Sequence, residues 1–284
     1  MTGKIVTMRK ADAGETAGIM ELARSSQETI RVNEFWITKI PGGGKSRIRE
    51  GKTNSGIYFV FSPEEFNLSY KLDGKSYSMK VSAAGLPGGA ECSIDHTSAV
   101  YVSGISEGSA KEVKIRAPVG FTHENITNNL KHGKPNKLVV PSKMNNEVLL
   151  EEGTVAGGTG NYLFIGPENQ EFSAGNSSSP QDFHLHKYTM EAFVTFSGMT
   201  LVYAGENGQL NETRAKPGDI IIVPSGVAHY SIMSGLEPTY VMKASSNPIK
   251  TDKYIVNASE YAISGVEDDT RDALNGILRR GNNT

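Results

Sequence analysis

The stretch HLHKYTMEAFVTFSG (184–198) decides the fold class of this chain. His184 and His186 stand two residues apart, at the start of a series of short apolar runs. In a strand, side chains at i and i+2 point to the same face, so both imidazoles can reach one ion. Glu191 follows and adds a carboxylate. The stretch predicts a metal site that is carried by β-strands.

A second stretch, GDIIIVPSGVAH (218–229), adds a third histidine to the set. Pro224 and Gly226 form a turn, and His229 stands three residues later on the next expected strand. Three neutral imidazoles and one carboxylate suit Fe, Mn, Ni, Co, Cu or Zn, and suit Ca or Mg poorly. A metal that prefers five or six ligands keeps open positions in such a site, and open positions serve chemistry or ligand binding. We expect one divalent transition metal ion, of unknown identity.

Short apolar runs separated by turn residues continue on both sides of these stretches. Asp73-Gly74 and Asn207-Gly208 each predict a tight hairpin, because these dipeptides accept the positive φ of a type I′ turn. Many short strands at close spacing favour an antiparallel sandwich or barrel over a parallel α/β sheet. The polar segment 124–160 is expected to be a connector between two halves.

Helix signals are confined to the two ends of the chain. Residues 14–30 are a helix candidate. The stretch VEDDTRDALNGILRR (266–280) carries acidic residues early and arginines late, which complements the helix dipole. Its apolar residues fall near one face and are expected to pack on the β-structure: Val266, Leu274, Ile277 and Leu278.

Composition excludes several function classes. The 284 residues include 29 basic and 31 acidic ones, and this net charge of −2 argues against a general nucleic-acid binder. The single cysteine, Cys92, excludes an intramolecular disulfide framework and a CxxC zinc site. No apolar run approaches the ~20 residues of a membrane span, and no signal peptide is visible, so a cytoplasmic protein without membrane contact is expected.

The two histidine stretches resemble the two sequence motifs of the cupin superfamily. The first motif reads G-x5-H-x-H-x3,4-E-x6-G, and only its leading Gly is missing, with Ser178 in its place. The second reads G-x5-P-x-G-x2-H-x3-N, and Met233 replaces its final Asn. The resemblance covers about 160–245 and implies an all-β fold with a cupin jelly-roll barrel. It also implies the metal ligands, which are His184, His186, Glu191 and His229.

The N-terminal half is expected to be a degenerate copy of the same barrel, which makes the chain similar to a bicupin. SAVYVSG (98–104) lines up with AFVTFSG (192–198), and Pro118–His123 repeats the P-x-G-x-x-H spacing of 224–229. On this alignment the counterparts of His184, His186 and Glu191 are Ala90, Cys92 and Thr97, so no metal site survives there.

These patterns predict three regions along the chain. Residues 1–150 are expected to form a degenerate cupin-like β domain. Residues 151–250 are expected to form the metal-binding cupin barrel, and 251–284 a tail with a short helix.

The resemblance implies an enzyme and leaves its reaction class open, because cupins host many activities. Bicupins of the quercetin 2,3-dioxygenase type look similar, which favours a dioxygenase that acts on an enolic or phenolic, flavonol-like or polyketide-like substrate bound to the metal. Glu191 would then be both ligand and general base. The alternatives are a redox-neutral isomerase, cyclase or lyase, and a non-catalytic module that binds a small ligand. A small-molecule substrate and dioxygen are the expected partners, and a homo-oligomer is left open.

Strand alternation selects candidate substrate-binding residues in the barrel. Residues that share parity with a ligand, or that line the strand before the turn, should face the metal. They are Phe193, Thr195, Ile221, Val223, Ser231 and Met233.

Overall fold

The computed structural model describes residues 6–8, 20–22, 28–32, 35–50, 57–72, 74–87, 91–105, 119–131, 138–144, 147–153, 162–165, 170–175, 182–205, 207–233, 237–245 and 252–281. The chain forms two compact units. The first, here called the C-terminal barrel, comprises Met1–Arg9, Gly157–Asn161 and Glu168–Thr284. The second, the N-terminal barrel, comprises Lys10–Ala156 and Tyr162–Pro167. Among the described residues, no helix is both long and apolar enough to span a bilayer.

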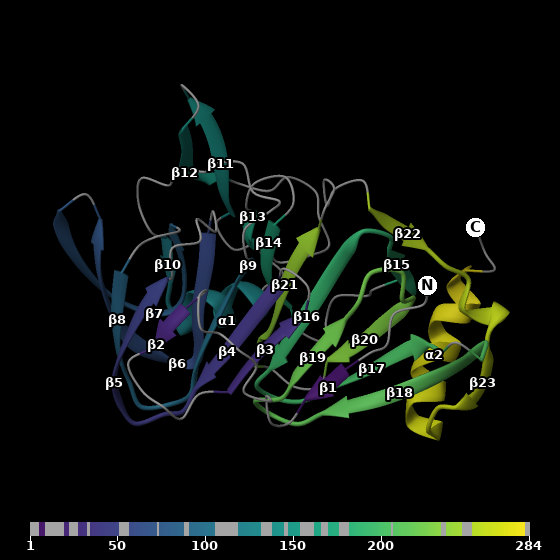
Figure 1. Cartoon of the computed structure of the whole chain (residues 1–284). Helices are drawn as coiled ribbons and strands as arrows, with labels where there is room; N and C mark the ends of the chain where they lie inside the picture. Colours follow the sequence, from purple (N-terminus) through teal and green to yellow (C-terminus); the bar gives the residue numbers. More distant parts are fainter. Residues whose placement is uncertain are drawn as a thin grey trace. The chain divides into compact units, whose positions relative to one another are not determined.

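The C-terminal barrel is a jelly roll of two sheets that are antiparallel except for the parallel pair of β18 and β23 (Figure 1). Its strands are β1 (Val6–Met8), β14 (Gln170–Gly175), β15 (His184–His186), β16 (Thr189–Thr195), β17 (Met199–Ala204), β18 (Gln209–Ala215), β19 (Ile220–Val223), β20 (His229–Met233), β21 (Thr239–Ser245), β22 (Lys253–Ile255) and β23 (Ala262–Gly265). One sheet has the order β1-β19-β16-β21-β14 and the other β22-β15-β20-β17-β18-β23. Chain-consecutive strands β14, β15, β16 and β17 alternate between the sheets, as jelly-roll topology requires.

Each sheet of this barrel has an inner apolar face. Strand alternation puts one set of side chains inside, and these form a cluster with Phe193, Leu201 and Val223 at its centre. The opposite face of the β15-β20-β17-β18 sheet carries Phe183 and Val202, which pack in a second cluster. The ligand strands are therefore buried from both sides.

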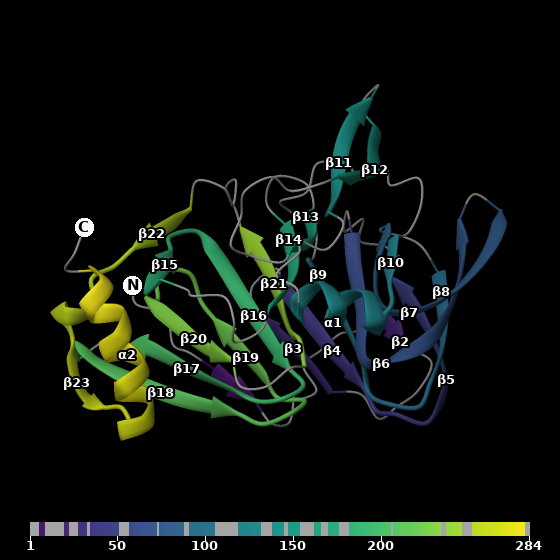
Figure 2. The same ribbon diagram turned by 180° about the vertical axis from the view of Figure 1, so that it is seen from behind.

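The helix α2 (Asp268–Gly281) covers this second cluster (Figure 2). It confirms the helix expected near the end of the chain, and a short 3-10 turn (Ala258–Glu260) precedes it. Val266 and Leu274 are buried in the cluster as expected, whereas Ile277 and Leu278 lie outside the residues whose side chains are described.

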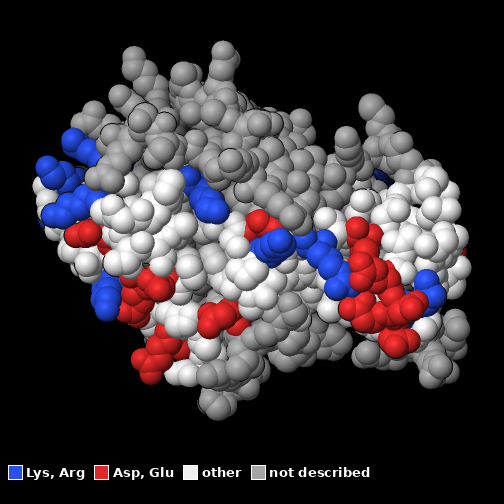
Figure 3. All heavy atoms as spheres, turned by 90° about the horizontal axis from the view of Figure 1, so that it is seen from below, with Lys and Arg blue, Asp and Glu red and all other residues white. Residues whose placement is uncertain are grey.

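Exposed ion pairs accompany the contact of this helix with β18. Arg214 lies within 3.0 Å of carboxylate oxygens of Glu212, Glu267 and Asp269. Figure 3 shows that acidic and basic side chains lie next to each other on one face, and the part of that face that the structure describes carries no continuous basic tract. Exposed pairs contribute little each, and Leu274 is the residue of α2 that is buried in the apolar cluster.

The N-terminal barrel repeats the jelly-roll topology with longer strands. Its elements are β2 (Met20–Leu22), β3 (Glu28–Val32), β4 (Phe35–Ile40), β5 (Gly44–Glu50), β6 (Ile57–Leu72), β7 (Lys75–Pro87), β8 (Glu91–His96), β9 (Val100–Ile105), β10 (Val119–Phe121), α1 (His123–Lys131), β11 (Leu138–Met144), β12 (Glu147–Gly153) and β13 (Tyr162–Ile165). The first part of β6 pairs with β9 and its second part with β8, and the pairing shifts between Phe61 and Phe66. Strand β6 thus occupies the positions of two jelly-roll strands. Strand β7 pairs with both parts of β6 and spans two positions as well.

Both hairpins predicted from the sequence are present. Gly74 joins β6 to β7 with a φ of 76°, and Gly208 joins β17 to β18 with a φ of 72°. Glycine accepts this left-handed conformation without strain. The all-β fold class, the pair of jelly rolls and the C-terminal helix are confirmed.

Two local expectations are wrong. The structure describes strands β2 and β3 at residues 20–22 and 28–32, where part of the helix candidate 14–30 lies, and the remainder of that candidate lies outside the described residues. The expected connector 124–160 contains α1 and the paired strands β11 and β12. In α1 the polar residues Glu124 and Asn125 are exposed and Ile126 is buried, so a polar composition there did not exclude a helix.

The alignment of the two halves is also wrong, although both are jelly rolls. SAVYVSG (98–104) lies mostly on β9, which pairs with β4 and with the first part of β6, as β21 pairs with β14 and β16. It therefore corresponds to β21 and not to β16, on which 192–198 starts. His123 begins the helix α1 and is not on a strand, so it does not correspond to His229. Alternating β-branched runs recur in all strands and do not identify a particular one.

Strand register identifies the true counterpart of His229. His229 lies opposite His184 on the neighbouring strand, and in the N-terminal barrel Cys92 lies opposite Ile48 in the same way. The spacing from Pro87 to Cys92 also equals the spacing from Pro224 to His229.

The counterpart of Glu191 follows from the next strand pair. Glu191 lies opposite Val223, the residue before Pro224, and Tyr58 lies opposite Leu86, the residue before Pro87. The counterparts of His184 and Glu191 are thus Ile48 and Tyr58, not Ala90 and Thr97. Cys92 is the counterpart of His229, not of His186. All three counterparts are buried in the main core cluster of the N-terminal barrel. Burial raises the pKa of the Cys92 thiol to about 12, against a smaller opposite effect of its hydrogen bond with Tyr58. The alkyl chain of Ile48, the phenol of Tyr58 and the neutral thiol of Cys92 thus stand at the positions of three predicted metal ligands.

Candidate metal centre

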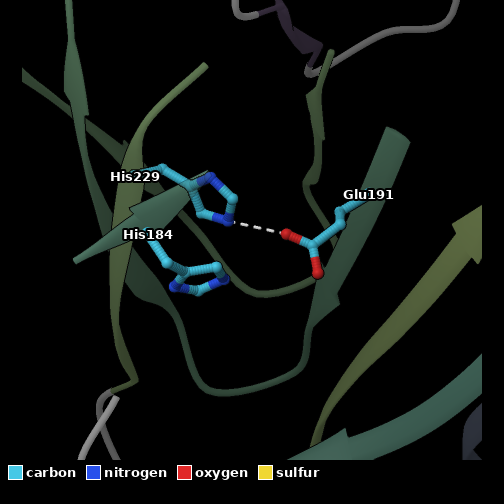
Figure 4. A group of neighbouring side chains, drawn as sticks. All are labelled: His184, Glu191 and His229. Carbon is cyan, nitrogen blue, oxygen red and sulfur yellow. Dashed lines mark ion pairs between the residues drawn. The ribbon is translucent and has the colours of Figure 1, made fainter. Parts of the chain in front are cut away.

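The four predicted ligands meet inside the C-terminal barrel (Figure 4 shows His184, Glu191 and His229). His184 and His186 extend from the same face of β15, and His229 extends from β20 directly opposite His184. Glu191 comes from β16 in the other sheet. None of the four is more than 6% exposed.

The donor atoms face one another. Atoms of His184, Glu191 and His229 that can bind a metal lie within 4.8 Å of each other. His229 Nε2 is 2.6 Å from Glu191 Oε2. His186 lies beside this group of three, with its Nε2 3.4 Å from Glu191 Oε1.

Backbone carbonyls orient two of the imidazole rings. His184 Nδ1 lies 2.7 Å from the carbonyl oxygen of Asp182, and His229 Nδ1 lies 3.0 Å from that of Val227. A carbonyl oxygen only accepts hydrogen bonds, so each Nδ1 carries the proton and donates it. In the neutral ring Nε2 then has a lone pair that can bind a metal. Such an outer hydrogen bond is the usual way in which a metal-binding histidine is held.

Several of these buried donor atoms have no hydrogen-bond partner of acceptable geometry among the described residues. They are both ring nitrogens of His186, Nε2 of His229 and Oε2 of Glu191. His229 Nε2 and Glu191 Oε2 lie 2.6 Å apart, which requires a cation between them, either a proton shared as a hydrogen bond or a metal ion. The residues therefore fit a divalent transition ion, which prefers imidazole nitrogen with a carboxylate oxygen.

Protonation states also suit a metal. Burial lowers the pKa of His184 to about 3, and the neighbouring His229 ring adds to this effect. Burial alone would raise the pKa of Glu191, but the Lys243 ammonium and the His229 ring hold it well below its ordinary value. A neutral His184 and an ionised Glu191 are the forms that bind metal, so binding at this pair does not have to displace a proton near neutral pH.

The lowered pKa of His184 predicts how the metal-free protein responds to acid. Below about pH 6.5 the unfolded chain protonates this imidazole and the folded chain does not, so its contribution to stability is lost as the pH falls towards 3. We expect the free energy of unfolding to fall by up to about 1.4 kcal/mol per pH unit from this group. Urea denaturation of metal-free wild type and His184→Gln between about pH 4.5 and 6.5 measures it. Equal slopes in the two proteins would contradict the assignment.

An aspartate that sequence reasoning missed holds the loop between the ligands. The Asp252 carboxylate is buried and accepts from the Tyr188 N–H, 3.0 Å from each oxygen, and from the Thr189 hydroxyl at 2.5 Å. This loop joins His186 to Glu191. Asp252 lies outside both histidine motifs, and nothing in the sequence marks it as a partner of residues about 60 positions away.

Removing this carboxylate should loosen the centre. We expect Asp252→Ala to lower the free energy of unfolding by about 1–3 kcal/mol, because the buried Thr189 hydroxyl and the Tyr188 N–H lose their acceptor. Metal affinity should fall about 10- to 100-fold, as when other outer-shell partners are lost. Urea denaturation and metal titration measure the two effects. Asp272→Ala, at an exposed position of α2, is the matched control and should change neither.

The predicted substrate-binding residues are all buried in this barrel. Phe193, Ile221 and Val223 belong to the inner apolar cluster, and the Phe193 ring centroid is 6.1 Å from that of His229. The Thr195 hydroxyl accepts hydrogen bonds from Gly198 N–H and the Thr239 hydroxyl. Ser231 and Met233 follow His229 on β20 with the same parity. Their contact with a substrate stays a prediction.

Comparisons with known proteins give structural similarities only. No family model and no curated protein matches the sequence. The protein Ylba from E. coli is similar over 85% of this chain and 89% of its own, with 11% identity and a TM-score of 0.49. The oxalate decarboxylase from Bacillus subtilis is similar over 87% and 80%, with 14% identity and a TM-score of 0.38. The oxalate decarboxylase from Lactobacillus farciminis is similar over 89% and 92%, with 12% identity and a TM-score of 0.39. At these levels no activity is carried over to this chain.

Proposed function

We propose that this chain is a metal-dependent enzyme that reacts an enolic or phenolic small molecule with dioxygen. The observation that carries the proposal is the set of buried donor atoms of His186, Glu191 and His229 that lack hydrogen-bond partners among the described residues. A structural metal site is normally closed by four protein ligands in tetrahedral array, but metals such as Fe and Mn take further ligands. Open positions inside a barrel support chemistry on a bound molecule.

The residues around the centre have separable roles. His184, His186 and His229 would hold the ion, together with Glu191. When bound, the ion would supply a Lewis acid for an enolate oxygen and a centre that can react with dioxygen. The apolar side chains of Phe193, Ile221 and Val223 would exclude water, and they suit an aromatic or polyketide-like substrate better than a charged one.

Glu191 would accept the proton of the substrate hydroxyl. Its carboxylate is ionised near neutral pH because Lys243 and His229 lower its pKa against the effect of burial. It is also close enough to the imidazoles to face any molecule held by the same ion. General base catalysis requires such proximity in addition to charge.

Oxygen dependence tests the proposal. Purified protein loaded in turn with Fe²⁺, Mn²⁺, Co²⁺, Ni²⁺ or Cu²⁺ is screened against flavonols and related enols, in an oxygen electrode and in parallel without oxygen. We expect oxygen uptake that matches substrate loss, and none with His229→Gln. Full turnover without oxygen would replace the proposal with a redox-neutral isomerase, cyclase or lyase. Ligand binding without turnover of any candidate would favour a binding module.

A further inference from the structure

Three charged side chains form a row across three neighbouring strands of the C-terminal barrel. Glu171 on β14 lies opposite Lys243 on β21, and Lys243 lies opposite Glu191 on β16. Lys243 Nζ is 3.2 Å from Glu171 Oε1 and 3.2 Å from Glu191 Oε1. The side chains of the two glutamates are 8% and 3% exposed, and that of Lys243 is 17% exposed. A metal ligand is thus the end of a buried charge row.

Burying an ion costs more free energy than an exposed ion pair contributes. A buried row of charges is therefore stable only when its positive and negative charges compensate each other. One ammonium between two carboxylates leaves a net charge of −1. The histidine ligands add no charge in their neutral forms. A divalent ion bound at the Glu191 end of the row would offset the remaining negative charge.

The two oxygens of Glu191 have different surroundings. Oε1 faces the Lys243 ammonium at 3.2 Å. Oε2 lies 2.6 Å from His229 Nε2 and has no hydrogen-bond partner of acceptable geometry within the described part of the chain. Oε1 also lies 3.4 Å from His186 Nε2. One oxygen is therefore held by a cation of the protein itself, and the other is turned towards His229.

We infer that Lys243, oriented by Glu171, is a positioning residue that makes Glu191 a one-oxygen ligand. By holding Oε1, the ammonium leaves Oε2 as the oxygen that binds the ion. The coordination position that a two-oxygen carboxylate would fill stays open for substrate or dioxygen. This inference rests on the metal centre of the proposed function but does not depend on the reaction that the centre performs.

The test uses cobalt(II) as a spectroscopic probe in the full-length protein. The visible absorption of bound Co²⁺ weakens as its coordination number rises. We expect Lys243→Met to bind one Co²⁺ with a clearly weaker absorption per ion, because the released Oε1 can also bind. Lys243→Arg should restore the wild-type spectrum, since a guanidinium can hold the same oxygen. Lys216→Met, the same change at an exposed position, should leave the spectrum unchanged.

A double variant separates positioning from a role in folding. Lys243→Met leaves Glu171 as a buried carboxylate without this cation, so the chain is also prepared as Glu171→Gln/Lys243→Met, which removes both charges. We expect the double variant to show the weaker absorption of the single variant. A wild-type spectrum in either variant would overturn the inference. Failure of the wild-type protein to bind Co²⁺ would instead overturn the metal centre of the proposed function.

Discussion

Replacing His229 by Gln is expected to weaken metal binding by at least about 100-fold. This exceeds the 10- to 100-fold loss that follows when an outer-shell partner is removed, because His229 supplies a ligand atom itself. Its Nε2 lies 2.6 Å from Glu191 Oε2, and its Nδ1 is held by the Val227 carbonyl, so no other group can take its place without moving β20. Isothermal titration of the metal-free protein with Mn²⁺, Co²⁺ or Zn²⁺ measures the loss.

His123→Gln is the matched control for this experiment. His123 begins helix α1 in the N-terminal barrel, where its Nε2 lies 3.3 Å from the Thr127 hydroxyl, so metal affinity should stay within about twofold of wild type. Equal affinities in His229→Gln and wild type would show that the metal binds elsewhere.

Replacing Glu191 by Gln is expected to lower turnover by about 10²–10⁴-fold while part of the metal is retained. An amide has nearly the shape of the carboxylate but cannot accept the substrate proton, and general base catalysis contributes an effect of this size. The three histidines remain to hold the ion. Steady-state rates per bound metal, with the substrate found in the oxygen screen, measure the effect.

The control here is Glu267→Gln, a change of the same kind at an exposed carboxylate that pairs with Arg214. It should keep the wild-type rate, because exposed ion pairs contribute little. If Glu191→Gln loses metal and activity in equal proportion, Glu191 is a ligand only, and the proton must go to another group.

The sequence was sufficient to predict that His184, Glu191 and His229 converge with His186 beside them, because their spacing encodes strand geometry directly. Their binding of a metal stays a prediction. The i, i+2 pair His184 and His186 had to share a face of one strand. The Pro224–Gly226 turn placed His229 at the start of the next strand, opposite His184. These are short-range relations, and the jelly roll followed from them through the resemblance to cupins.

Relations between distant strands could not be predicted. The row from Glu171 through Lys243 to Glu191 depends on strand pairing across about 70 residues, and no local pattern encodes that register. One signal was available: Lys243 follows the buried Val241 by two residues, so a charged side chain stands at an inward position of an apolar strand. A lysine at such a position needs a buried partner.

The correspondence between the two halves failed for a related reason. In the N-terminal barrel, β6 and β7 each run through two jelly-roll positions, so strand counting from the sequence loses its register. Pairing then shows Ile48, Tyr58 and Cys92 at the three ligand positions. The loss of the ligands in this half was predicted, but at other positions.

Anomalous diffraction at the absorption edge of the bound metal tests the central claim most directly. Crystals of the full chain, grown after loading with excess Mn²⁺ or Co²⁺ and removal of unbound ions, should give one strong peak per chain. The account predicts that this peak lies among His184, His186, Glu191 and His229, with none beside Ile48, Tyr58 and Cys92. A peak in the N-terminal barrel, or a fully loaded crystal without a peak at the four ligands, would contradict it.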